Sequence, residues 1–325
     1  MPGTFIISLD CEGKWGMADQ VADFQRSTLT NKRLTEAYRK IIDILNHHQI
    51  KGTFAFVAAF TMSVDEYRVN KDWFANVHVE GKSWLGEFSR EIAENRFEGW
   101  FNPDCFNIVR KETQHEIASH GFSHLPLAEF LINEEDFIRE INLIKTCSNF
   151  KDRRNMTFVY PRNLVGYTNL LRDAGFIGYR DGVHLTSSSN KGIPKLFLRA
   201  KSLFSDLNIK TPAKPHSIGG SIIPIPASVC LNWRHGLRKK IPMAVTIKRW
   251  RNIIKDAITN QKVAHLHTHP HNFITGDQMY TLLEEVLKIV SNAQRRSELV
   301  NLTQREYVEG ILGCLKTKNK ENYRT

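Results

Sequence analysis

Alternating apolar runs and amphipathic segments constrain the fold of this chain more than any other feature. "TFIISLD" at 4–10 and "KGTFAFVAAF" at 51–60 are β-rich apolar runs. The segment 31–50 between them repeats apolar residues at the spacing of an amphipathic helix, with Asn31 as its predicted N-cap. This order predicts a βαβ unit, in which the two strands run parallel.

The same alternation recurs along the rest of the chain. Helices are predicted at 133–150, 166–175, 244–260 and 277–293, strands at 156–161, 176–180 and 262–269, and a final strand and helix within 298–312. Asn133 is the predicted N-cap of the first of these helices. Strands that alternate with helices predict an α/β fold with a largely parallel sheet, open or closed into a barrel.

Two segments interrupt this order. Residues 63–112 have helical character and contain Trp73, Trp84 and Trp100, which predicts an insertion whose tryptophans pack into a core more readily than they line a groove. Residues 191–231 are rich in Ser, Pro and Gly and predict loops with short β segments. We expect one domain over 1–315, with the insertion at about 63–112, and a disordered tail at 316–325.

Charge and cysteine content indicate which partners and which cellular compartment fit the chain. Its 45 Lys and Arg against 34 Asp and Glu give a net charge of +11, which indicates either an anionic partner or a merely basic surface. Five widely separated cysteines without a Cys-x-x-Cys pair do not form a disulfide framework. The sequence has no apolar run of about 18 residues, and its first residues lack the pattern of a signal peptide, so we expect a cytoplasmic protein.

The stretch "HEIASHGFSH", 115–124, contains the clearest candidate metal ligands. His120 and His124 are four residues apart, so on a helical turn both rings would project to one side and could bind one cation. Such a pair alone is a weak signal. His115 lies outside this spacing, and we expect it to have a structural or supporting role.

Asp10 and Glu12 are the candidate carboxylates. They end a predicted parallel strand, where ligands bind in α/β folds, and residues two apart in a strand face the same side. They could instead cap the following turn. Two histidines, one carboxylate and a water form a common open arrangement for catalytic zinc, which strengthens the metal interpretation.

Two further stretches contain candidate catalytic side chains. In "HLHTHPHNF", 265–273, strand alternation places His265, His267 and His269 on one face, so at least one could reach the site, whereas a solvent-exposed strand end is plausible for His265 and His271. In "FVYPRN", 158–163, Arg162 could donate two parallel hydrogen bonds to a carboxylate and lower its pKa. A surface salt bridge is the alternative for Arg162.

Taken in order, these stretches resemble the motifs of the polysaccharide deacetylase family, the NodB-homology group or carbohydrate esterase family 4. The Asp-x-Glu form of the first motif resembles a subgroup in which the two acidic residues are not adjacent. The resemblance implies a distorted (β/α) barrel that holds a divalent metal, with zinc as the expected ion. It also implies the following roles: Asp10 as base, Glu12, His120 and His124 as metal ligands, Arg162 as the arginine that tunes the base, His269 as proton donor, and His267, Asn163 and Asp181 as secondary residues.

The activity implied by this resemblance is metal-dependent hydrolysis of an N-acetyl or related acyl group on an amino sugar of a glycan precursor, in cell-surface polysaccharide biosynthesis. The substrate would be an N-acetylated sugar or a lipid-linked glycan. The basic segment 234–255 contains eight Lys or Arg residues and no acidic residue, and could either lie against an anionic membrane surface or form a solvated helix face. Alternatives are a hydrolase of cyclic or linear amides and a non-catalytic glycan-binding module; no motif supports binding of nucleic acid.

Overall fold

The computed structural model describes residues 2–74, 77–181, 222–227 and 229–322, and within them one large parallel sheet forms the centre of the chain. Its nine strands follow the order β8-β7-β6-β5-β2-β1-β10-β9, and β11 pairs with the start of β1. All strand pairs in this sheet are parallel. The strands are β1 (Gly3–Cys11), β2 (Thr53–Phe56), β5 (Glu116–Ser119), β6 (Thr157–Val159), β7 (Gly178–Asp181), β8 (Ile223–Pro226), β9 (Val229–Cys230), β10 (Val263–Thr268) and β11 (Leu299–Asn301).

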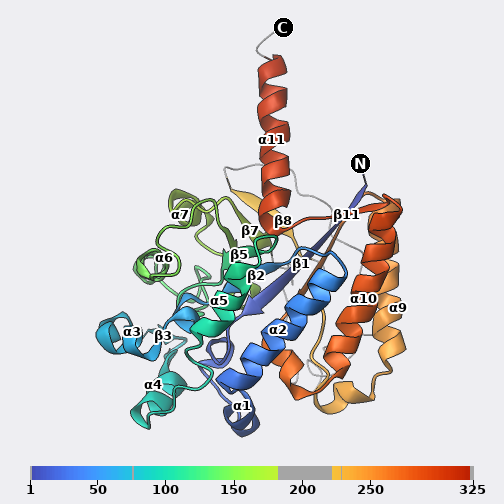
Figure 1. Cartoon of the computed structure of the whole chain (residues 1–325). Helices are drawn as coiled ribbons and strands as arrows, with labels where there is room; N and C mark the ends of the chain where they lie inside the picture. The colour runs from blue at the N-terminus through green and yellow to red at the C-terminus, as the bar shows by residue number, and fades with distance from the viewer. Residues whose placement is uncertain (1, 75–76, 182–221, 228, 323–325) are drawn as a thin grey trace, which may run out of the picture.

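Helices cover the outer face of the sheet. Helices α2, α5, α9 and α10 pack around β1 and its neighbours, whereas α11 projects beyond the rest of the described chain (Figure 1). The α-helices are α1 (Asp23–Thr28), α2 (Asn31–His47), α3 (Val64–Val69), α4 (Gly86–Ala93), α5 (Pro103–Lys111), α6 (Glu134–Thr146), α7 (Thr168–Asp173), α9 (Met243–Thr259), α10 (Gln278–Arg295) and α11 (Gln304–Asn322). The predicted alternation of strands and helices is thus confirmed.

Local sequence explains where these helices begin. The side chain of Asn133 accepts a hydrogen bond from the backbone N–H of Asp136 (2.8 Å), so the predicted cap of α6 is confirmed. In α2 the cap is Thr30 and not Asn31, whose side chain instead donates to the carbonyl of Phe101 (2.8 Å). The apolar face of α2 is buried as predicted, through Leu34, Ala37, Tyr38, Ile41, Ile42 and Leu45.

The segment 63–112 adds α3, α4, α5 and the two-stranded sheet of β3 (His78–Val79) and β4 (Lys82–Ser83). Trp84 and Trp100 are buried in the main core and Trp73 packs against it, so their predicted packing role is confirmed. Trp15, in the loop after β1, meets Trp100 edge-to-face at 5.1 Å between ring centres. The insertion therefore shares one aromatic core with the loop that follows β1.

The amino ends of the strands are closed by α11. Tyr307 and Val308 pack against an apolar cluster that includes Ile6 and Ile225. Helix α11 runs to Asn322 and so extends over 316–322 of the predicted tail, and residues 323–325 lie outside the described residues. The carboxyl ends of the strands lie at the opposite end of the sheet.

The predicted loop segment 191–231 and the expected absence of a membrane-spanning helix can be compared only with the residues that the structure describes. Of the predicted loop segment 191–231, residues 191–221 and 228 lie outside the described residues, and the remainder contains β8 and β9. Among the residues that the structure describes, no helix is both long and apolar enough to cross a membrane.

Candidate metal centre

Side chains from three strand ends meet at the carboxyl end of the sheet. Asp10 and Glu12 come from the end of β1, His120 follows β5, and His269 follows β10. The two carboxylates are 3% and 5% exposed, so neither merely caps a turn at the surface. This is where ligands bind in parallel α/β sheets.

Glu12, His120 and His124 form a compact group of possible metal ligands. Glu12 Oε2 lies 2.9 Å from His124 Nε2 and 3.2 Å from His120 Nε2. The ligand atoms of all three side chains lie within 4.8 Å of one another, and all three residues are buried. Gly16 leaves room for this group, because a methyl group at that position would overlap Glu12 Oε1.

The tautomer of His120 favours a cation at this point. Its Nδ1 lies 2.7 Å from the carbonyl oxygen of Val159, so Nδ1 carries the proton and donates it. In the neutral ring, Nε2 then has only a lone pair, and that lone pair faces the Glu12 carboxylate. Two acceptors at 3.2 Å repel each other unless a cation lies beside both or the ring is protonated. The three side chains therefore fit a divalent metal such as zinc, for which a carboxylate and two imidazoles are common ligands.

Local charges act on the pKa of these groups in opposite directions. Burial alone would raise the pKa of Glu12, but the charges of His124 and His269 hold it well below the usual value. Burial lowers the pKa of His124, although Glu12 opposes this effect. A carboxylate and neutral imidazoles are the forms that bind a metal.

The two histidines come together by a different local geometry from the one predicted. Residues 120–124 are not helical; they form a loop after β5 in which Gly121 (φ 83°) and His124 (φ 61°) have left-handed backbones. The rings still lie 4.8 Å apart between centres. The spacing thus predicted the pair correctly, whereas the predicted helical turn was wrong.

Arg180, and not Arg162, binds Asp10. Its Nη1 and Nη2 lie 2.6 and 2.7 Å from the two oxygens of Asp10, and Arg180 is fully buried. Burial alone would raise the pKa of Asp10, but the charge and hydrogen bonds of Arg180 outweigh it and keep the carboxyl ionised. Arg180 also donates to Asn163 Oδ1 (2.7 Å) and Ser8 Oγ (3.0 Å), so Asn163 supports the arginine.

The predicted role of Arg162 is therefore wrong. Its backbone is left-handed (φ 57°), and the side chain pairs with Asp19 (2.6 Å) and lies over the ring of Trp84, 4.7 Å from its centre. Arg180 ends the predicted strand 176–180, and the same strand-end argument that selected Asp10 could have found it. Asp181, the next residue in β7, faces the opposite side from Arg180 because side chains alternate along a strand.

His269 lies close to both carboxylates. Its Nε2 lies 3.7 Å from Asp10 Oδ2 and 3.7 Å from Glu12 Oε1, and its side chain is 27% exposed. His267 Nδ1 is buried, and burial and the charge of Arg180 hold the pKa of His267 well below the usual value. The geometry therefore favours His269 over His267 as the group that could reach a ligand.

The solvent-exposed alternative for His265 and His271 is wrong. His265 is fully buried between Ser8 Oγ (2.9 Å) and the carbonyl of Pro226 (2.8 Å). His271 Nδ1 lies 3.9 Å from Glu12 Oε1, and burial and His269 lower the pKa of His271 to about 4. Sequence reasoning thus missed His271 as a neighbour of the candidate metal ligands, because a short helical turn (η6, Pro270–Thr275) folds it back toward them.

No protein-family model and no curated protein matches the chain. Several solved structures, however, match the chain over most of its length. A putative polysaccharide deacetylase from Mycobacterium smegmatis matches with a TM-score of 0.58 and 14% identity, over 96% of this chain and 92% of that one. A probable polysaccharide deacetylase from Pseudomonas aeruginosa matches with a TM-score of 0.49 and 9% identity, over 94% and 89% of the two chains. The first similarity, together with the parallel sheet, shows that the chain has the fold of a distorted (β/α) barrel of the NodB-homology type.

Proposed function

We propose that the chain belongs to the polysaccharide deacetylase family and is a metal-dependent hydrolase that removes an acetyl or related acyl group from an amino sugar. The observation that carries this proposal is the buried group of Glu12, His120 and His124 beside the Asp10–Arg180 pair. In a site of this kind a bound divalent metal, zinc in our proposal, acts as a Lewis acid that acidifies water and polarises the acyl carbonyl.

The chain's own residues then divide the proton transfers. Asp10, kept ionised by Arg180, accepts a proton from the attacking water. His269, partly exposed and 3.7 Å from both Asp10 and Glu12, donates a proton to the leaving amine. Asn163 and Ser8 hold Arg180 in place, so the base keeps its orientation.

Substitutions of the two carboxylates and His269 test this division. We expect Glu12→Gln to lose metal and activity together, because it removes a ligand. Asp10→Asn should keep the metal and lose turnover, and His269→Ala should keep the metal and lose about 100-fold or more in rate. Metal content by mass spectrometry and release of acetate from N-acetylated sugar oligomers provide the measurements, with circular dichroism as the check on folding.

Three outcomes would contradict the proposal. Equal loss of metal in Asp10→Asn and Glu12→Gln would reject the separate roles of the carboxylates. Hydrolysis of cyclic ureides without deacetylation would favour the hydrolase of cyclic or linear amides. A wild-type protein that binds sugar but no metal would favour the glycan-binding module.

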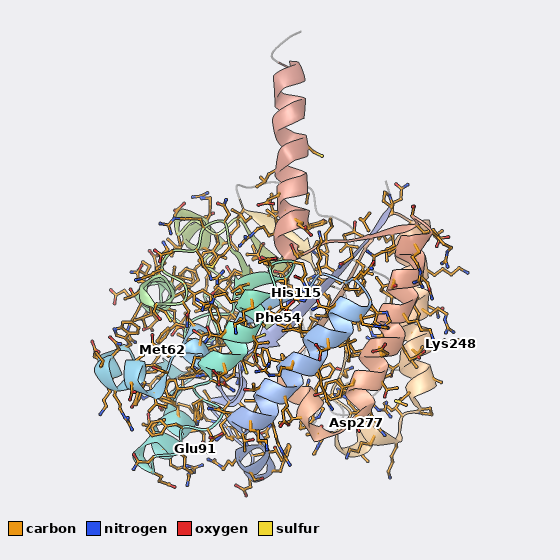
Figure 2. All side chains as sticks on the ribbon, in the orientation of Figure 1. Phe54, Met62, Glu91, His115, Lys248 and Asp277 are labelled. Atoms are coloured by element: carbon orange, nitrogen blue, oxygen red, sulfur yellow. The ribbon has the colours of Figure 1, made fainter. Side chains whose placement is uncertain are left out.

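We further propose that the enzyme acts in the cytoplasm on a glycan precursor at an anionic membrane surface. Support comes from the segment 234–255, where Lys239, Lys240 and Lys248 are exposed and Leu237 is 62% exposed (Lys248 is labelled in Figure 2). Arg249 is buried and does not contribute to this surface.

Vesicle flotation tests this surface. We expect the protein to float with vesicles that contain anionic lipid, and not with neutral ones, and the binding to weaken with salt. Replacement of the three lysines by glutamine should abolish flotation. Equal recovery with both kinds of vesicle, or none with either, would contradict the proposal.

A further inference from the structure

A buried carboxylate outside the metal group, that of Glu140, accepts hydrogen bonds only from the loop that carries His124, among the described residues. Glu140 lies in α6 and is 5% exposed. Its Oε2 accepts hydrogen bonds from the backbone N–H groups of Phe122 and Ser123, each at 3.0 Å, and its Oε1 accepts one from Ser123 Oγ at 2.6 Å. Burial raises the pKa of Glu140, and these donors oppose that effect. A buried carboxylate is costly unless such donors satisfy it.

The neighbouring Arg139 does not pair with this carboxylate in the structure. Its Nη2 donates to the carbonyl of Trp73 at 2.7 Å. Every short contact found for the Glu140 carboxylate among the described residues therefore leads to the loop 120–124.

That loop needs restraint, because its backbone is unfavourable. His124 is left-handed (φ 61°), a conformation that costs a residue with a side chain about 1 kcal/mol or more. Ser123 is held at all three of its polar groups: Glu140 accepts from its N–H and its hydroxyl, and its carbonyl accepts from Trp84 Nε1 at 3.2 Å. The residue just before His124 is thus fixed from α6 on one side and from the insertion on the other.

The two metal-binding histidines also differ in how their rings are oriented. His120 is aligned by its own hydrogen bond, from Nδ1 to the carbonyl of Val159. His124 Nδ1 is buried and has no hydrogen-bond partner among the described residues. Metal-binding histidines are usually oriented through their second nitrogen. For His124 this orientation has to come from the backbone to which the ring is attached.

We infer that Glu140 is a positioning residue that aims His124 at Glu12 by fixing the loop 120–124. The inference rests on the proposed function, because it treats His124 as a metal ligand. The hydrogen bonds of Glu140 come from Phe122 and Ser123, so it acts through the loop.

A second buried glutamate provides a matched control. Glu116, at the start of β5, is also 5% exposed, and burial also raises its pKa. It too accepts three hydrogen bonds, from Thr53 Oγ1 (2.8 Å), Thr157 Oγ1 (2.5 Å) and the backbone N–H of Arg305 (2.9 Å). It lies at the amino ends of the strands and holds α11, not the loop of His124.

The experiment compares Glu140→Ala, Glu140→Gln and Glu116→Ala for Co²⁺ and Zn²⁺ affinity, for the visible spectrum of the Co²⁺ protein, and for thermal unfolding without metal. We expect Glu140→Ala to weaken metal binding about 10-fold to 100-fold and to change the Co²⁺ spectrum. Glu140→Gln should restore both, because its amide oxygen still accepts from the two backbone N–H groups. Glu116→Ala should lower the unfolding temperature but leave affinity and spectrum unchanged.

The results separate positioning from general stability. Wild-type affinity and spectrum in Glu140→Ala would overturn the inference, as would an equal loss of metal in Glu116→Ala. If Glu140→Ala does not fold, Ser123→Ala removes only the hydroxyl bond; we expect roughly threefold weaker metal binding, and unchanged affinity would overturn the inference. A wild-type protein that binds neither ion would contradict the proposed function itself and remove the premise of the inference.

Discussion

At the scale of single residues, the pairing of Asp10 with Arg180 is the most consequential contact. Both side chains are buried, and two buried charges are tolerated only when their geometry and additional hydrogen bonds compensate for lost hydration. Arg180 meets this condition through both Asp10 oxygens, Asn163 and Ser8. The pair therefore contributes to folding as well as to the ionised state of Asp10.

The two arginines should differ sharply when substituted. Arg180→Gln leaves Asp10 buried without its cation, so we expect the free energy of unfolding to fall by about 3–5 kcal/mol. Arg162→Gln removes a half-exposed pair with Asp19 and should cost less than about 1 kcal/mol. Urea unfolding measures both values, and similar losses in the two variants would contradict the assignment of Arg180.

Sequence reasoning at this scale succeeded where spacing along one segment was sufficient. Asp10, Glu12, His120 and His124 were found because each pair lies close in the chain and at a strand end. Arg162 was misplaced because its backbone is left-handed and turns the side chain toward Asp19. No pattern in the sequence predicts this backbone conformation. Arg180 ends the predicted strand 176–180, so its place at the site follows from the strand-end argument, whereas its pairing with Asp10, 170 positions away, follows from no local spacing.

At the scale of elements, the insertion is tied to the loop after β1 by a buried charge network. Lys14 Nζ lies 2.7 Å from Glu91 Oε2, and Arg26 Nη1 lies 2.6 Å from Glu91 Oε1. Trp100 Nε1 donates to the same carboxylate at 2.8 Å. Glu91, labelled in Figure 2, thus joins α4 to the segment that begins two residues after Glu12.

Removal of this carboxylate tests the connection. We expect Glu91→Ala to lower the free energy of unfolding by about 3–5 kcal/mol, because Lys14 is left buried without a partner. Glu94→Ala, which removes an exposed carboxylate that pairs with Arg96, is the control and should cost less than about 1 kcal/mol. Thermal unfolding of both variants provides the comparison, and equal losses would show that the network does not hold the insertion.

The order of strands and helices was predictable because each element shows its own periodicity. The contacts between distant elements were not. β11 pairs with β1 almost 300 positions earlier, and no local pattern encodes that pairing. The insertion was recognised by its tryptophans, but its short helices and β3–β4 hairpin lack the length at which periodicity identifies an element.

At the scale of the whole molecule, the two ends of the sheet carry different kinds of residues. The amino ends hold α11 and a set of buried polar residues, and the carboxyl ends hold the candidate metal group of Glu12, His120 and His124. His115 belongs to the first set: its Nδ1 accepts a hydrogen bond from the Gly52 N–H (3.1 Å), and its ring lies beside Phe54 (Figure 2). Its predicted supporting role agrees with this position.

His115 should make the fold sensitive to acid. Burial lowers its pKa from 6.5 to about 4, so between these values the unfolded chain binds more protons than the folded one. Stability from this residue is complete above pH 6.5 and is lost as pH falls toward 4, by about 2.5 kcal/mol at pH 4.5. We expect His115→Asn to remove that part of the loss. Urea unfolding at pH 7.5 and 4.5 measures it; an identical pH dependence in the variant would contradict this account.

The alternation of side chains along β1 has a consequence for how this chain can change in length. Ser8, Asp10 and Glu12 all project toward the site because they are two residues apart. Insertion or deletion of one residue within β1 would turn Leu9 and Cys11 toward the site and bury the three polar groups in the core. In related chains, length differences should therefore fall between the strands, while β1 keeps one length.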